Sequence, residues 1–216
     1  MGIFDFLNTA KTGFKISDKD GVITLTGYTK KADVPGTLTI PETVQAIGTD
    51  ALSSTEHVTK IIVPESVRSI GEHAFSFSQA LEEVVLPNNP EALSDALGLF
   101  MDCLKLKTVQ LPAGMNAIPS FFMSHCYDLE EFVIPEGVEE IEIGAFDSCE
   151  KLRYVRLPQS LKLIACGAFS HCTALESLTL PAGLEMIEVN AFEDCPRLKR
   201  LDIPQGCEVD EEAFGE

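Results

Sequence analysis

The feature that most constrains this chain is an aliphatic residue followed by proline that recurs at a nearly constant interval. The eight prolines are separated by 23 residues, apart from one interval of 25 residues. They are Pro41, Pro64, Pro87, Pro112, Pro135, Pro158, Pro181 and Pro204. A fixed period of about 20–50 residues is typical of solenoids, in which each repeat stacks on its neighbours. The sequence therefore predicts one elongated domain rather than two separate cores.

Apolar residues keep fixed places relative to each proline. In the unit that begins at Pro135, Val138 and Ile141 stand three and six positions after the proline, and the pair Ala145 and Phe146 follows. From the second unit on, each unit closes with a segment of the form L-x-x-(V/L/I/F)-x-(L/I)-P, headed by Leu81, Leu106, Leu129, Leu152, Leu175 or Leu198. Its last residues alternate with a period of two, as in a strand with one buried face. Stacked units therefore predict a parallel ladder of short strands about 4.8 Å apart, in which no unit is stable without its neighbours.

The ends of the chain and one central unit depart from this pattern. Residues 1–33 lack the repeat, and two alternating segments around a turn at 18–21 predict a β-hairpin that caps the solenoid. We expect the solenoid over residues 34–216, with seven full units at 41–203 and a partial, acidic cap at 204–216. In the 25-residue unit, residues 92–100 suit a helical turn or two. The loop at 88–100 is either a tolerated two-residue insertion or a loop that determines binding specificity.

The repeat pattern I-P-x-x-V-x-x-I-x-x-x-A-F-x-x-C-x-x-L-x-x-V-x-L-P closely resembles the 23-residue leucine-rich repeat of bacterial surface antigens of the BspA-like type. The match runs from about residue 34 to the C-terminus. The resemblance implies an α/β leucine-rich repeat fold, namely a right-handed curved solenoid with a parallel β-ladder on its concave face and short strands or helical turns opposite. It also implies binding of proteins or matrix, without catalytic residues to carry over. Many relatives are exported and carry further domains.

Charge and hydropathy restrict the partners. The chain has 34 acidic and 16 basic side chains, which give a formal charge of -18. Such a field repels polyanions, so we expect no nucleic-acid partner. No run approaches the roughly 18 apolar residues of a membrane helix, which predicts no membrane insertion. Because the first residues do not form a secretory signal, we expect a cytoplasmic protein, with the cell surface or secretion as the alternative if an export signal precedes this sequence. A monomer is favoured.

Five cysteines share one repeat position, which first suggests thiol or metal chemistry. They are Cys103, Cys126, Cys149, Cys172 and Cys195. Parallel Cβ vectors keep neighbouring Cβ atoms about 4.8 Å apart, beyond the roughly 3.5–4.5 Å of a disulfide, and Thr55 and Ser78 fill the same position in earlier units. A packing role is therefore predicted. His125 and His171, each beside a cysteine, lie two units or about 10 Å apart, too far to share a zinc ion. We predict no metal, no cofactor and no catalytic residue.

The outward positions of the closing strands carry the candidate binding surface. Arg153, Tyr154 and Arg156 form the one aromatic and cationic group in an acidic chain, and Tyr and Arg are typical of binding hot spots. Glu131 and Arg200 occupy equivalent outward positions in neighbouring units and complete the candidate set. The alternative is a solvated face whose charges pair locally with flanking acidic residues, for instance Glu130, Glu131 and Glu176.

The leading hypothesis is a non-enzymatic protein-interaction module that binds a protein partner through the concave strands. A fragment of a cell-surface adhesin that binds a host or matrix protein is the alternative. An enzyme ranks third, because no P-loop, dinucleotide-binding glycine motif or convergent catalytic set occurs in the sequence.

Overall fold

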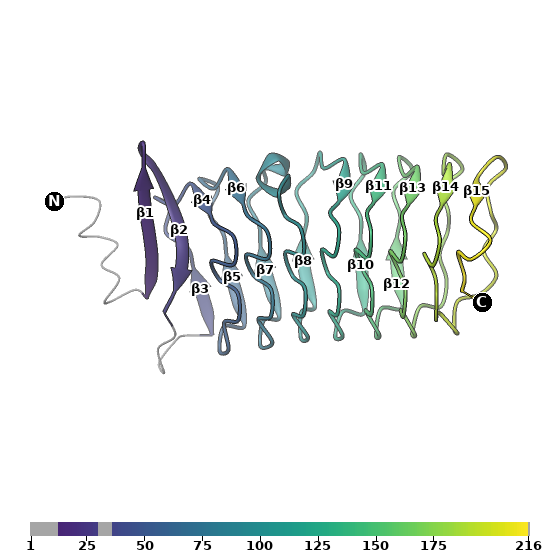
Figure 1. The fold of residues 1–216 in the computed structure, drawn as a ribbon, viewed down its shortest axis with the longest axis horizontal. Coiled ribbons are helices and arrows are strands. Elements are labelled where there is room, and N and C mark those ends of the chain that lie inside the picture. The colour runs from purple at the N-terminus through teal and green to yellow at the C-terminus, as the bar shows by residue number, and fades with distance from the viewer. Residues whose placement is uncertain (1–12, 30–35, 216) are drawn as a thin grey trace.

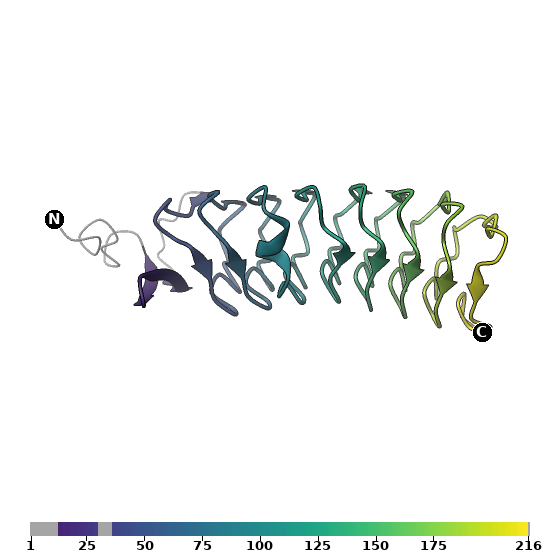
Figure 2. The same cartoon turned by 90° about the horizontal axis from the view of Figure 1, so that it is seen from above.

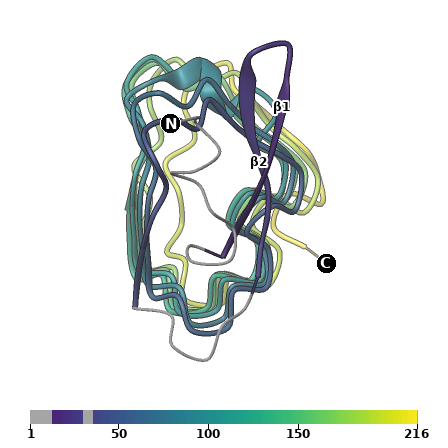
Figure 3. The same ribbon diagram turned by 90° about the vertical axis from the view of Figure 1, so that its left-hand side faces the viewer.

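The computed structural model describes residues 13–29 and 36–215, which form a parallel β-solenoid extended along one axis (Figures 1 and 2). About eight turns follow one another, and they superimpose as one outline when viewed down the long axis (Figure 3). The repeat period thus predicted the parallel solenoid, and this is confirmed. Helix is scarce in the described residues, where one short 3-10 helix occurs. The α/β class, the right hand and the concave curvature stay predictions.

The first side of the solenoid is a ladder of three-residue strands that close each unit, here called the face ladder. Its strands are β3 (Thr37–Thr39), β5 (Lys60–Ile62), β7 (Glu83–Val85), β8 (Thr108–Gln110), β10 (Glu131–Val133) and β12 (Tyr154–Arg156). Neighbouring strands are parallel, and each residue pairs with the residue at the same repeat position one unit away, as Lys60 does with Glu83. The central residue of a strand, such as Ile61 or Val84, is buried. The ladder has two parts, β3-β5-β7-β8 and β10-β12, and Tyr154 of the second part adds a bridge to Ser177.

The second side is a ladder of two-residue strands, here called the back ladder. Its strands are β4 (Ala46–Ile47), β6 (Ser69–Ile70), β9 (Ala117–Ile118), β11 (Glu140–Ile141), β13 (Leu163–Ile164), β14 (Met186–Ile187) and β15 (Glu208–Val209). Strands β1 (Phe14–Lys19) and β2 (Val22–Tyr28) form an antiparallel hairpin, and β2 pairs with β4, so the hairpin covers the first turn. Residues 1–12 and 30–33 of the expected cap lie outside the described residues.

The third side, here called the turn ladder, has hydrogen bonds between turns without β-strands. In the 23-residue units from Pro41 to Pro158, the residues nine, eleven and thirteen positions after the proline donate their N–H groups to carbonyls of the next unit, as in Phe146 to Ala168 at 2.8 Å. The equivalent donors of the 25-residue unit are Gly98, Phe100 and Asp102, and the unit at Pro181 retains the bonds of Asn190 and Phe192. The residues at the first and third of these positions have a left-handed backbone with φ between 49° and 62°. They are Asp50, Ser54, His73, Phe77, Gly98, Asp102, Phe121, His125, Gly144, Ser148, Gly167, His171, Asn190 and Asp194. A left-handed side-chain-bearing residue costs about 1–2 kcal/mol, so these bonds maintain a strained conformation in every turn.

The aromatic residue of the Ala-Phe pair forms a continuous stack along the C-terminal half, buried at Phe146, Phe169 and Phe192 and exposed at Phe214. Phe146, Phe169, Phe192 and Phe214 lie with successive ring centroids 5.2, 5.6 and 5.7 Å apart and ring planes tilted by 3°, 2° and 16°. Aromatic pairs at such distances stabilise a core by about 0.5–1.5 kcal/mol beyond the area they bury. The stack therefore makes each C-terminal unit depend on the unit before it.

The 25-residue unit interrupts the back ladder, because the helix η1 (Pro90–Leu93) stands where a strand would lie between β6 and β9. The sequence placed this helical turn at 92–100, and that placement is wrong. Pro90 lacks an N–H and has a φ suited to a first helical turn, so the helix begins there. The helix ends at Leu93. The chain then rejoins the turn ladder at Gly98, whose N–H donates to Ser120 O at 2.9 Å.

Candidate functional site

Arg153 and Tyr154 lie on the exposed side of the face ladder and are held in place by Glu176 of the next unit. The guanidinium of Arg153 donates Nε–H and Nη2–H to Glu176 Oε1 at 3.1 and 2.8 Å, and Tyr154 Oη–H donates to Glu176 Oε2 at 3.1 Å. The guanidinium carbon also lies 5.4 Å from the centre of the Tyr154 ring, within the range of a cation–π contact. Both side chains are therefore exposed yet oriented.

The charges of this cluster stabilise one another. Hydrogen bonds from Arg153 and then from Tyr154 lower the pKa of the Glu176 carboxyl, and the charge of Lys199 adds to this. The same contact raises the pKa of Arg153. Of the three acidic partners considered from the sequence, Glu176 makes the direct contacts. The cluster consequently presents an oriented tyrosine beside a cation whose charge is already paired.

The other predicted site residues are less closely associated. Arg156 and Glu131 are exposed on β12 and β10, and their side chains make no hydrogen bond or ion pair within residues 13–29 and 36–215. Arg200 lies two units beyond Tyr154 in the repeat. It lines a separate C-terminal cavity of about 560 Å³ together with Ile203 and Phe214. The structure thus unites Arg153 with Tyr154, flanks them with Arg156 and Glu131, and separates Arg200 from them.

The face ladder is open between β8 and β10, a feature that the sequence did not reveal. Five positions before each closing proline, the backbone N–H donates to the residue one unit earlier, in Thr59, Glu82, Lys107, Arg153, Glu176 and Lys199. Glu130 is the one residue missing from that series, because no bond from its N–H to Lys107 O is formed. The next N–H, that of Glu131, likewise lacks the bond that Tyr154 makes to Glu130 O at 3.4 Å. No ladder joins β8 to β10 in the described part of the chain.

A groove of about 730 Å³ follows this opening, and we call it the split groove. It is lined by residues of the two strands and their flanks, namely Lys107, Thr108, Val109, Gln110, Leu111, Asp128, Glu130, Glu131, Phe132, Val133 and Pro135. Val109 and Leu111 are half-buried, whereas Val84 and Leu86, the equivalent residues one unit earlier, are buried. At the rim, 61% of Val133 is exposed. The split therefore uncovers part of the apolar interior on the face ladder.

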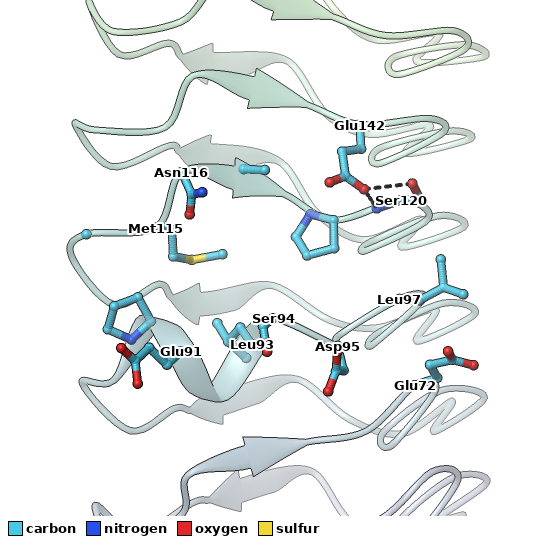
Figure 4. Close-up of a pocket in the computed structure, with 14 residues that line it drawn as sticks. Glu72, Glu91, Leu93, Ser94, Asp95, Leu97, Met115, Asn116, Ser120 and Glu142 are labelled. Atoms are coloured by element: carbon cyan, nitrogen blue, oxygen red, sulfur yellow. Dashed lines mark hydrogen bonds between the residues drawn. The ribbon is translucent and has the colours of Figure 1, made fainter.

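A second groove of about 850 Å³ lies on the back ladder between η1 and β9 (Figure 4). Glu72, Glu91 and Asp95 stand around it, and Glu142 enters from β11's side, where its Oε2 accepts from the N–H and Oγ–H of Ser120 at 2.9 and 2.8 Å. No Lys, Arg or His is among the residues that line this groove. The back groove is thus uniformly acidic, and one of its carboxylates already has a local structural role.

The cysteine column has a structural role. Each of its five thiols donates S–H to the backbone carbonyl of the preceding unit, at 3.2, 3.3, 3.2, 3.2 and 3.1 Å from Cys103 to Cys195. In the earlier units Ser78 Oγ–H donates to Leu52 O at 3.2 Å from the same position. Burial raises the pKa of Cys103 and of Cys195 to about 12, which keeps these thiols protonated and unreactive at neutral pH.

The histidines beside these cysteines are fixed to the turns. His171 Nδ1 lies 2.8 Å from Ser170 Oγ and 3.3 Å from Asp147 Oδ1, and its Nε2 lies 3.4 Å from Asp194 Oδ2. This serine, histidine and aspartate arrangement was missed from the sequence, although Ser-His occurs at both histidines. Ser170 is buried to 5% exposure, so a substrate has no access to a nucleophile there. Among the described residues, no group of three or more His, Cys, Asp or Glu side chains converges on a metal position, and no helix is long and apolar enough to span a membrane.

Comparisons with known proteins agree with this geometry. The model of the BspA type leucine-rich repeat region matches the chain in six copies, over residues 35–152 and 96–216. A crystal structure of a leucine-rich repeat protein from Bacteroides ovatus is 30% identical with a TM-score of 0.79, over 91% of this chain and 53% of that protein. A leucine-rich repeat protein of T. pallidum is 28% identical with a TM-score of 0.75, over 88% of this chain and 89% of that one.

A third structure, from Eubacterium ventriosum, is 26% identical with a TM-score of 0.75, over 92% of this chain and 54% of that one. The chain thus spans about half the length of the Bacteroides and Eubacterium proteins. No curated protein matches it.

Proposed function

The chain belongs to the BspA-type leucine-rich repeat family, and from this premise we propose that it is a non-enzymatic module that binds a protein partner through its face ladder. Leucine-rich repeat proteins are generally protein-interaction modules, because stacked repeats present an extended surface that a partner can follow. The proposal adds to this a specific face and a specific centre, the cluster of Arg153, Tyr154 and Glu176.

The oriented Tyr154 is the observation that supports this centre. Tyr154 is 42% exposed, its hydroxyl donates to Glu176, and the Arg153 guanidinium lies over its ring. An aromatic side chain held in one rotamer before binding loses little conformational entropy when a partner covers it. Arg156, exposed on the same strand, adds a cation free for an acidic group of the partner. Aromatic and arginine side chains of this kind dominate interface energies.

The absence of catalysis is part of the proposal. Four of the five ladder thiols are buried and Cys195 is half-buried, Ser170 is inaccessible, and His125 and His171 contact aspartates of the turns. These groups have structural partners and do not converge on one exposed point where a substrate atom could react.

The test is quantitative capture of partners from the native organism by the immobilised chain. Arg153→Ala, Tyr154→Ala and Arg156→Ala combined in one variant should reduce the retained partner at least about tenfold, as expected for loss of an interface hot spot. The control variant combines Glu139→Ala with Lys162→Ala, an exposed ion pair of 2.7 Å on the back ladder. If the triple alanine variant retains as much partner as the control variant does, the cluster around Tyr154 is not the binding centre.

A further inference from the structure

We propose that the split groove receives one extended strand of the partner, with basic side chains on its outer side, which inserts between β8 and β10 and completes the face ladder. This inference rests on the proposed function, because it names the kind of segment that the face ladder binds. Its main support is the bond missing at Glu130 in the series of backbone bonds made by the residues five positions before each closing proline.

The backbone on both sides of the groove is prepared for pairing. Glu131 begins β10, and Glu130 and Lys107 directly precede β10 and β8, the strands that are fixed by pairing with β12 and β7. The N–H groups of Glu130 and Glu131 lie on one side of the groove and the carbonyl of Lys107 on the other. A strand placed between them meets an edge on each side, as in the β-strand additions that many peptide-binding proteins use. An edge strand left unpaired on a stable sheet is a template for such pairing.

The side chains around the groove define what the strand carries. Because strand residues alternate between two faces, one set of the incoming side chains points toward Val109 and Leu111, the half-buried floor, and should be aliphatic. The other set points outward, where Asp128, Glu130 and Glu131 line the groove. The one cation of the lining, Lys107, is already paired with Glu82 at 3.1 Å. Outward Lys or Arg side chains therefore complement the groove.

The experiment uses the full chain and the labelled peptide Ac-Thr-Lys-Val-Lys-Val-Lys-Thr-NH2, with binding measured by fluorescence anisotropy. We expect saturable binding with a dissociation constant below about 1 mM. Methylation of alternate backbone nitrogens in the peptide should abolish binding, because it removes the donors for one edge while leaving every side chain in place. The amides of Glu130 and Glu131 should gain protection from hydrogen exchange when the peptide binds.

Two variants with the same charge change separate insertion from general attraction. Val133→Lys places a cation at the groove rim, on a residue that is 61% exposed, and should weaken binding at least about tenfold. Val85→Lys is the matched control, because Val85 is 40% exposed at the equivalent position of β7, a strand paired on both sides. It should change binding by less than about twofold.

Equal weakening by both lysine variants, undiminished binding of the methylated peptide, or no binding would overturn the inference. If the peptide does not bind but the triple alanine variant at Arg153, Tyr154 and Arg156 still loses its partner, the proposed function stands and only the strand insertion fails. If the peptide binds but the triple alanine variant keeps its partner, the binding centre lies in the split groove.

Discussion

Gly144 is a position where the turn ladder leaves little room for a side chain. Its φ is +59°, and a Cβ added there would lie 2.7 and 2.8 Å from Cε1 and Cδ1 of Phe121, the equivalent residue one unit earlier. Gly167, at the equivalent position one unit later, has φ +62° and no atom nearer than 3.9 Å to such a Cβ. The two glycines therefore share a backbone conformation and differ in the space beside them.

The magnitudes follow from this difference. A left-handed alanine costs about 1–2 kcal/mol, and about 0.4–1 kcal/mol is recovered because the unfolded chain loses freedom. Gly167→Ala should thus lower the free energy of unfolding by about 1 kcal/mol. Gly144→Ala should lower it by about 2–3 kcal/mol, because ring carbons prefer separations of about 3.5–4.0 Å and the Phe121 ring, 38% exposed, must leave its packed position.

Urea unfolding followed by far-ultraviolet circular dichroism measures both free energies, with midpoints compared at a shared slope. Phe121→Ala should remove the extra cost of Gly144→Ala, which corresponds to a coupling of about 1–2 kcal/mol in the double-mutant cycle. Equal destabilisation by Gly144→Ala and Gly167→Ala, or additive effects of Gly144→Ala and Phe121→Ala, would refute the reasoning.

Three further predictions concern side chains. Cys149→Ser should retain more stability than Cys149→Ala, by about 1 kcal/mol in urea unfolding, because only a hydroxyl still donates to Met123 O; a more stable alanine variant would contradict this. At pH 8 a thiol reagent should modify half-buried Cys166 in the native chain but reach the four buried ladder thiols, Cys103, Cys126, Cys149 and Cys172, only after unfolding, because burial raises the pKa of Cys103 to about 12. Rapid modification of all thiols in the native chain would count against this. Because the pKa of Glu176 is lowered in the folded chain, the stability that its carboxylate contributes is present at neutral pH and is lost as the pH falls below about 4. The difference in urea midpoint between the native chain and Glu176→Gln should therefore disappear below about pH 4. A difference that does not change with pH would show that the carboxylate charge is not involved.

The sequence predicted the strands that follow the repeated apolar pattern. It did not predict features that depend on how one turn is placed relative to the next. The spacing of the prolines and the strand pattern before each of them identified the parallel ladder. The long unit was recognisable from the asparagines and Pro90, yet the opening between β8 and β10 was not. The residues of both strands keep the regular pattern, and only the relative placement of two successive turns decides whether the N–H of Glu130 reaches Lys107.

The candidate site shows the same limit. Composition identified Arg153 and Tyr154 as unusual, and three acidic neighbours were considered as local partners. Which of them makes the contact depends on side-chain direction, and Glu176 in the next turn does so while Glu131 remains exposed. Arg200 shares the outward repeat position of Tyr154 but lines the cavity at the C-terminal end, because position within a unit does not report distance along the stack.

The turn ladder is continuous through the long unit, whereas both β-ladders stop there. Turn-ladder bonds such as those from Phe100 to Phe122 and from Asp102 to Ser124, each 2.9 Å long, join the turns from β1 to β8 to those from β9 to β15. The N–H of Asp128 adds a bond to Leu104 O at 3.0 Å. The apolar core also continues from one half to the other, with Phe100 and Leu106 on one side and Phe122 and Leu129 on the other. The two halves of the face ladder are therefore positioned by the turns and the core beneath them, and the strands themselves contribute no pairing at this junction.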